Sequence, residues 1–131
     1  MLGVRTYPRE FIDTCRARVE SDVASYRTLA AGATDGFEST FFNNMLVVLD
    51  HSFVHRLRTV EGKDGNPLNE VRVLCDSLLS NKGLMGSDKT INLAPAKSVL
   101  KHQVGDPIKL TAADFERISE AFFAEIERKF R

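Results

Sequence analysis

The segment from Ser39 to Thr59 is apolar on nearly every side when it is placed on a helix of 3.6 residues per turn. Its large apolar side chains are Phe41, Phe42, Met45, Leu46, Val47, Val48, Leu49, Phe53, Val54 and Leu57. A helix of this kind belongs in the centre of a domain or at a subunit interface, because it has no broad polar side to present to water. The sequence therefore predicts that this segment lies in the core of the domain or at a contact between subunits.

Two further helices are marked by their first and last residues. A helix from Pro8 to Ala30 begins with proline at its first position, where a backbone N–H is not needed. A helix from Pro67 to Asn81 follows Asn66, which is a good N-cap residue, and Gly83 is placed to close it. Each has a clear apolar stripe. Residues 31–38, with two glycines, read as the connection between the first two helices.

The last predicted helix begins after Thr111, because Thr111 and Asp114 have the spacing of a capping box with Asp in place of Glu. Its apolar stripe is regular and consists of Phe115, Ile118, Phe122, Ile126 and Phe130. No linker, repeat or low-complexity tract divides the chain, so residues 1–131 are expected to form a single helical domain.

Residues 83–110 separate the third and fourth predicted helices, and this is too long for the roughly 2–8 residues of an ordinary bundle connection. Thr90–Leu93 and Pro107–Leu110 both alternate and could pair as a short two-stranded β-ribbon, while Pro95–His102 could form one or two helical turns. The predicted fold class is therefore mainly α, a four-helix bundle with a long crossover between helices 3 and 4.

Charge and hydropathy limit the partners that are expected. The 18 Lys and Arg residues balance 18 Asp and Glu residues, so no basic excess is present to neutralise the phosphates of a nucleic acid. The longest apolar run is Met45 to Leu49, far below the roughly 20 residues of a membrane helix.

Cys15 and Cys75 lie among apolar residues and are expected in the core. With no secretion signal, we expect a cytoplasmic protein.

Four polar residues of the second helix would occupy one narrow sector, opposite its main apolar stripe: Asn44, His51, His55 and Arg58. His51 and His55, four residues apart, could bind one divalent metal ion, with Asp50, Glu61 or Asp64 as further ligands. Hydrogen bonding of the two imidazoles across a helix or subunit interface is the favoured interpretation.

Two charged residues fall inside apolar stripes: Asp22 on the first helix and Arg56 on the second. An unpaired charge there would cost several kcal/mol, so Asp22 and Arg56 are expected to form a buried pair, with Arg18 as another partner for the carboxylate. The alternative is a polar pocket in which Arg56 clamps an anionic ligand and Asp22 orients it.

The stretch from His55 to Arg72 is dense in side chains that make directed hydrogen bonds. Within it, Glu61 to Asn66 lacks the ligand spacing of an EF-hand and of a phosphate-binding loop, so a rigid, capped turn is expected. If the protein has a binding surface, the best candidate combines this turn, with Glu61 and Asp64, and the polar side of the second helix.

The segments Phe41–Leu79 and Lys97–Leu110 resemble a family of small uncharacterised bacterial proteins. The resemblance covers much of the chain and implies a bacterial, cytoplasmic protein, with no ligand or activity to carry over.

No nucleophile elbow or dinucleotide fingerprint is present. We therefore expect a noncatalytic helical interaction module that forms a homodimer. The alternative is a metal- or small-ligand-binding bundle, which could be an enzyme, using His51 and His55.

Overall fold

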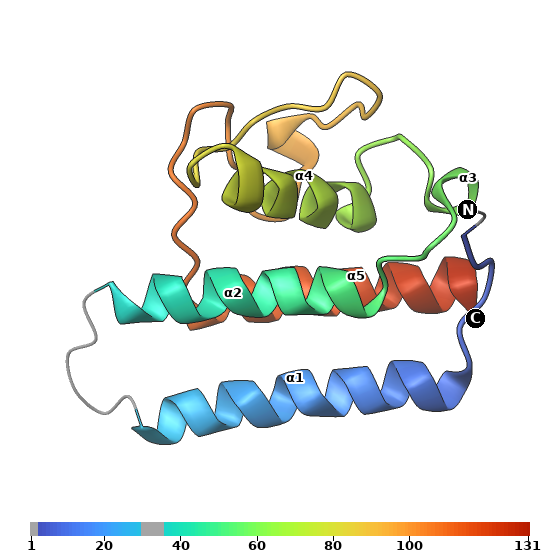
Figure 1. The fold of residues 1–131 in the computed structure, drawn as a ribbon, viewed down its shortest axis with the longest axis horizontal. Coiled ribbons are helices and arrows are strands. Elements are labelled where there is room, and N and C mark those ends of the chain that lie inside the picture. The colour runs from blue at the N-terminus through green and yellow to red at the C-terminus, as the bar shows by residue number, and fades with distance from the viewer. Residues whose placement is uncertain (1–2, 30–35) are drawn as a thin grey trace.

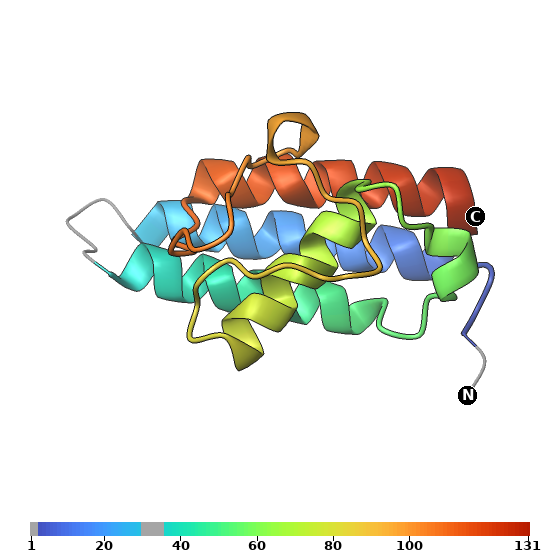
Figure 2. The ribbon, with the colours of Figure 1, turned by 90° about the horizontal axis from the view of Figure 1, so that it is seen from above.

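The computed structural model describes residues 3–29 and 36–131. This part of the chain is mainly helical, as predicted, and its elements are α1 (Arg9–Leu29), α2 (Phe37–Ser52), α3 (Arg58–Glu61), α4 (Pro67–Ser80), the 3-10 turn η1 (Pro95–Lys97) and α5 (Ala112–Phe130). α2 and α5 lie side by side, α1 covers one side of this pair, and α4 crosses the other side obliquely (Figures 1 and 2). None of these helices has both the length and the hydropathy needed to cross a membrane.

Aromatic side chains from several elements fill the core. Phe53, just after α2, is fully buried, and its ring lies 4.8 Å from that of Tyr7, 5.3 Å from that of Phe11 and 5.6 Å from that of Phe122. The backbone N–H of Tyr7 donates to the carbonyl of Phe130, which holds the start and the end of the described chain together. The core therefore joins segments that are far apart in the sequence.

The helix ends follow the predicted signals at most positions. The side chain of Asn66 accepts from the N–H groups of Leu68 and Asn69 at the start of α4. Thr111 and Asp114 form the predicted capping box of α5. The connection predicted at residues 31–38 lies mostly outside the described residues, and α2 begins at Phe37 rather than at Ser39.

The predicted end of the second helix at Thr59 is wrong, because α2 ends at Ser52. The chain then turns, and the N-terminal segment pairs with it: Val4 N–H donates to the His55 carbonyl (2.7 Å), and Leu57 N–H donates to the Val4 carbonyl (2.9 Å). A Cβ at Gly3 would lie 2.6 Å from the His55 carbonyl oxygen, so only glycine allows this approach. Tertiary pairing has replaced the last two helical turns.

The predicted β-ribbon between Thr90–Leu93 and Pro107–Leu110 is not found in the described residues; Pro107 instead makes an isolated bridge with Leu84. One helical turn, η1, forms where one or two were expected. The crossover is held to α4 by Glu70, whose carboxylate accepts from Val99 N–H at 2.8 Å and Leu100 N–H at 2.9 Å. Glu70 is only 2% exposed, so these bonds are shielded from water.

We expect the Glu70→Ala substitution to lower the free energy of unfolding by about 3 kcal/mol, since it leaves two backbone donors without their charged acceptor. Urea unfolding would measure the loss, and hydrogen exchange should be faster at Val99 and Leu100. The control is Glu120→Ala, at an exposed position on α5, which should change stability by less than about 0.5 kcal/mol. Equal stability of the two variants would refute the anchoring role of Glu70.

Candidate functional site

Arg56 lies at the centre of a network of charged side chains just beyond α2. Its side chain is 1% exposed, and its guanidinium donates from Nε to Glu61 Oε1 (2.9 Å), from Nη1 to the Phe53 carbonyl (3.0 Å) and from Nη2 to Asp50 Oδ1 (2.9 Å). The guanidinium carbon also lies 5.4 Å from the centre of the Phe122 ring. All three guanidinium nitrogens thus have an acceptor, which offsets the cost of removing the charge from water.

Glu61, the last residue of α3, is the shared acceptor of this network. Its side chain is fully buried and accepts from Arg56, from Nη2 (2.6 Å) and Nε (3.2 Å) of Arg72, and from Nδ2 of Asn69 (2.7 Å). Burial raises the pKa of Glu61, but the hydrogen bond from Arg72 and the charges of Arg56 and Arg72 outweigh burial, so this pKa lies below its usual value. Glu61 therefore stays ionised and bridges the two arginines.

The turn between α3 and α4 is fixed by Asn69, which is itself fully buried. Its Oδ1 accepts from Gly65 N–H (2.9 Å), and its Nδ2 donates to the Gly62 carbonyl (3.0 Å) as well as to Glu61. Lys129 of α5 adds a bond to the backbone carbonyl of Glu61 (2.9 Å). These contacts agree with the rigid, capped turn expected from the sequence, and they keep Glu61 at one position.

The predicted buried pair of Asp22 with Arg56 is wrong. Arg56 is buried, as expected, but its ion-pair partners are Asp50 and Glu61, while Asp22 is only half-buried on α1. The reason is the end of α2 at Ser52, because the turn that follows directs Arg56 toward α3 and α4 instead of α1. Arg18, the other predicted partner of Asp22, donates to Ser52 Oγ at 2.8 Å.

The predicted polar sector of the second helix is divided by the same turn. Asn44 and His51 are exposed on α2, whereas His55 is exposed in the turn and Arg58 begins α3. The i, i+4 geometry assumed for a metal site by His51 and His55 therefore does not exist, because the two residues do not share a helix. Within residues 3–29 and 36–131, no group of three or more His, Cys, Asp or Glu side chains is placed to hold a metal ion.

A cleft of about 330 Å³ lies beside the buried network and contains two of the predicted candidates, His55 and Arg58. Thr59, Arg56 and Arg72 also line it. Arg72 and Thr59 were not predicted as site residues. Arg72 ends the dense polar stretch, but no motif or spacing in the sequence distinguishes either side chain. The other candidates lie apart: Glu61 is buried beneath the network, and exposed Asp64 accepts a hydrogen bond from Asn66.

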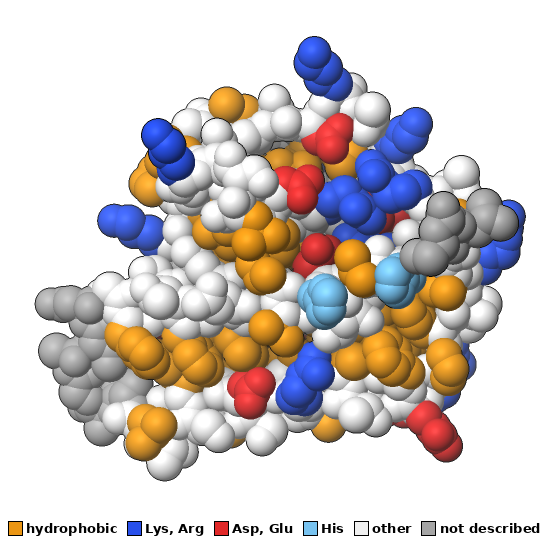
Figure 3. Space-filling view, viewed as in Figure 1, with side chains coloured by type: hydrophobic (Ala, Val, Ile, Leu, Met, Phe, Trp, Pro, Cys, Tyr) orange, Lys and Arg blue, Asp and Glu red, His pale blue; other side chains and the backbone are white. Residues whose placement is uncertain are grey.

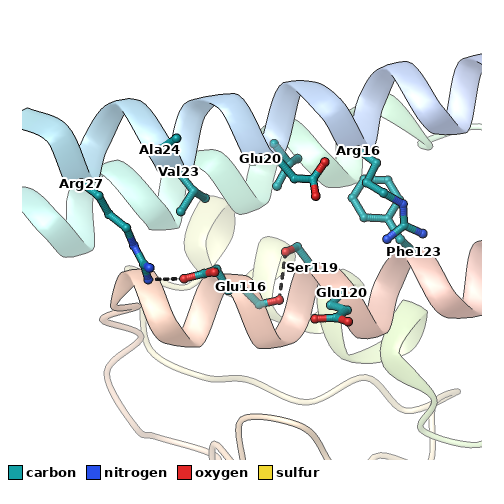
Figure 4. Close-up of a pocket in the computed structure, with 10 residues that line it drawn as sticks. Arg16, Glu20, Val23, Ala24, Arg27, Glu116, Ser119, Glu120 and Phe123 are labelled. Atoms are coloured by element: carbon teal, nitrogen blue, oxygen red, sulfur yellow. Dashed lines mark hydrogen bonds and ion pairs between the residues drawn. The ribbon is translucent and has the colours of Figure 1, made fainter.

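A second hollow, of about 380 Å³, separates α1 from α5 (Figure 4). Its apolar lining includes Val19, Val23 and Phe123. Charged side chains bridge it: Arg27 pairs with Glu116, as Figure 4 shows, and Arg16 pairs with Glu127 and lies over the Phe123 ring. These ion pairs hold the outer helix to the core, so we interpret the hollow as a bridged seam between helices.

The α1–α2 face, formed by outward-facing residues of these two helices, exposes large apolar side chains. Phe37 is 54% exposed, Val48 49% and Phe11 39%, and the charged residues Arg18 and Asp22 lie on the same side of α1. Figure 3 shows hydrophobic side chains following the seam between the helices, with charged groups beside them. Scattered apolar residues are normal on a surface, but large apolar side chains gathered along one seam are typical of a contact surface.

Both thiols lie in the core, as predicted. Cys15 and Cys75 are free and buried, and burial raises the pKa of each thiol above its usual value. A buried thiol with a raised pKa is a poor nucleophile, because the thiolate is the reactive form. Neither cysteine is therefore arranged for nucleophilic catalysis.

No protein-family model, curated protein or solved structure matches this chain. The resemblance to small bacterial proteins thus stays a prediction.

The lowered pKa of Glu61 predicts a specific dependence of stability on pH. The ionised carboxylate contributes stability that is complete above its ordinary pKa of 4.5 and is lost as the pH falls through the lower folded value. We expect Glu61→Gln to cost about 3 kcal/mol at neutral pH, because two arginines lose their charged partner. The stability difference from the wild type, measured by urea unfolding, should shrink in acid. A difference that is constant with pH would contradict the role of the charge, and exposed Glu120→Gln is the matched control.

Proposed function

We propose that this chain is a noncatalytic interaction module, built as a four-helix bundle, that assembles as a homodimer through the α1–α2 face. The observation that carries the proposal is the exposure of Phe11, Phe37 and Val48 on that face, at 39%, 54% and 49%. Contiguous apolar surface of this kind is characteristic of protein contacts. A second copy would shield these side chains from water.

The exposed side chains belong to two adjoining helical stripes. On α2, Phe37, Phe41, Val48 and Ser52 recur at helical spacing. The bond from Arg18 to Ser52 and the stacking of Tyr26 on Phe41, at 5.6 Å, place the α1 stripe beside them. The two stripes therefore form one surface along the length of both helices.

The charges on this surface are self-complementary. Arg18 and Asp22 lie one helical turn apart on α1 and have opposite charge. A two-fold axis perpendicular to α1, midway between Arg18 and Asp22 along the helix, would set α1 antiparallel to its symmetry mate. Arg18 of each copy would then face Asp22 of the other. The formal net charge of +0 adds no overall repulsion between the copies. A second copy of the chain is therefore the partner that the face fits best.

The polar core supports a noncatalytic role. Arg56, Glu61, Asn69 and Glu70 are buried, and each uses its polar atoms on internal partners. Side chains that are committed in this way stabilise the fold and are not available to a substrate. We also place the module in the cytoplasm, supported by the two free, buried cysteines, since small secreted domains commonly pair theirs.

Sedimentation equilibrium tests the dimer directly. The expected mass is twice the 14.7 kDa of the chain. Val48→Asp should yield the monomer, because it places an unpaired charge within the contact, while Val104→Asp, at a 70% exposed position in the crossover, should leave the dimer intact. A wild-type chain that stays monomeric at about 1 mM, the weak limit of specific association, would exclude the homodimer.

Charge exchange tests the proposed two-fold arrangement. Arg18→Asp and Asp22→Arg should each weaken dimerisation about tenfold, because each substitution places like charges opposite one another. The double variant restores opposite charges and should regain the wild-type dissociation constant. A double variant at least as weak as the worse single one would contradict this arrangement while leaving the Val48 test of the face unaffected.

A further inference from the structure

The cleft beyond α2 differs in chemistry from the α1–α2 face, because polar and charged side chains line it. At about 330 Å³ it is near the lower end of the roughly 300–1,000 Å³ typical of small-molecule pockets. Four side chains bring hydrogen-bond donors to its lining: His55, Arg58, Thr59 and Arg72. They come from the turn after α2, from α3 and from α4, and the N-terminal segment at Gly3 forms another wall.

Arg72 is the best-positioned donor. Its Nε and Nη2 both donate to Glu61, so the plane of the guanidinium is fixed by a fully buried carboxylate. Its Nη1 donates to no described residue, and the side chain is 18% exposed. A guanidinium that is held along one edge and open at the other loses little further freedom when it binds an anion.

The other donors are exposed residues of the same lining. His55, Arg58 and Thr59 donate no side-chain hydrogen bond to any residue that the structure describes. Arg56 lies deeper and has its guanidinium nitrogens committed to Asp50, Glu61 and backbone carbonyls, so it adds charge but no free donor. The free donors therefore approach the cleft from more than one element.

We propose that this cleft binds a small phosphate monoester, with Arg72, Arg58 and Thr59 holding the phosphate group. Such a group presents three terminal oxygens in different directions and carries a charge of about −1.5 to −2 near neutral pH. A carboxylate presents two oxygens in one plane and suits a single arginine. Donors that reach one cleft from α3 and from α4 thus match the tetrahedral group better.

Nearby carboxylates make the proposal more specific. Asp50 and Glu61 neutralise the buried network, while Asp76 and Asp88 line a neighbouring hollow of about 270 Å³ and act electrostatically on Arg58 and Arg72. Binding must therefore come from directed hydrogen bonds rather than from a general excess of positive charge. Removing the charge of Asp76 should strengthen binding, whereas removing that of Arg58 should weaken it.

The test is a titration of the full chain with methyl phosphate and inorganic phosphate, followed by NMR of the arginine Nε–Hε signals. We expect shifts of the Arg58 and Arg72 signals and a dissociation constant of about 1 mM or lower for methyl phosphate. Arg58→Gln, at an exposed position, should weaken binding about tenfold. Asp76→Asn should tighten it about two- to fivefold.

Arg117→Gln is the matched control, because Arg117 is an exposed arginine on α5. It should bind as the wild type does. The proposal is overturned if the Arg58 and Arg72 signals do not move, if Arg58→Gln and Arg117→Gln bind alike, or if Asp76→Asn does not bind more tightly. Acetate that binds as tightly as methyl phosphate would overturn the assignment to a phosphate group. Circular dichroism confirms that each variant is folded.

Discussion

The pairing of the Arg56 guanidinium with the Glu61 carboxylate ties the turn after α2 to α3 and, through Arg72, to α4. Both side chains are withdrawn from water, and either charge left alone would cost several kcal/mol. α2 ends at Ser52, and the turn and the short helix α3 that follow it bring Glu61 to Arg56. The end of the central helix and the buried pair therefore occur together.

The same contact organises the surface above it. Arg72 reaches Glu61 from α4, so the carboxylate joins three parts of the chain and fixes one wall of the cleft. His55 and Arg58 are exposed beside that wall, and Gly3 allows the N-terminal segment to approach closely enough to line the cleft as well. The buried network is structural, and it orients one of the donors beside it, Arg72, through the two bonds to Glu61. The proposed ligand site thus depends on the core pair without using Arg56 as a ligand.

The proposed dimer contact has a different origin. α2 carries apolar side chains on more than one side: Phe42, Leu46 and Leu49 are fully buried, while Val48 is half exposed. α1 covers only part of the remaining surface. Apolar patterning in the sequence can reveal this excess, but only the packing of α1 against α2 shows which side chains are left outside.

The sequence alone determined the helices whose ends carry local signals, because Asn66, Thr111 and Asp114 act within a few residues of their own position. It also determined that Arg56 would be buried and would need a partner. It could not identify that partner, since periodicity extended α2 through Arg56 and directed the side chain toward Asp22. The tertiary structure decided this point, because pairing with Val4 and Glu61 stabilises a turn that no local pattern encodes. His55 is exposed in that turn, and Glu61, which follows it, binds Arg72 of α4.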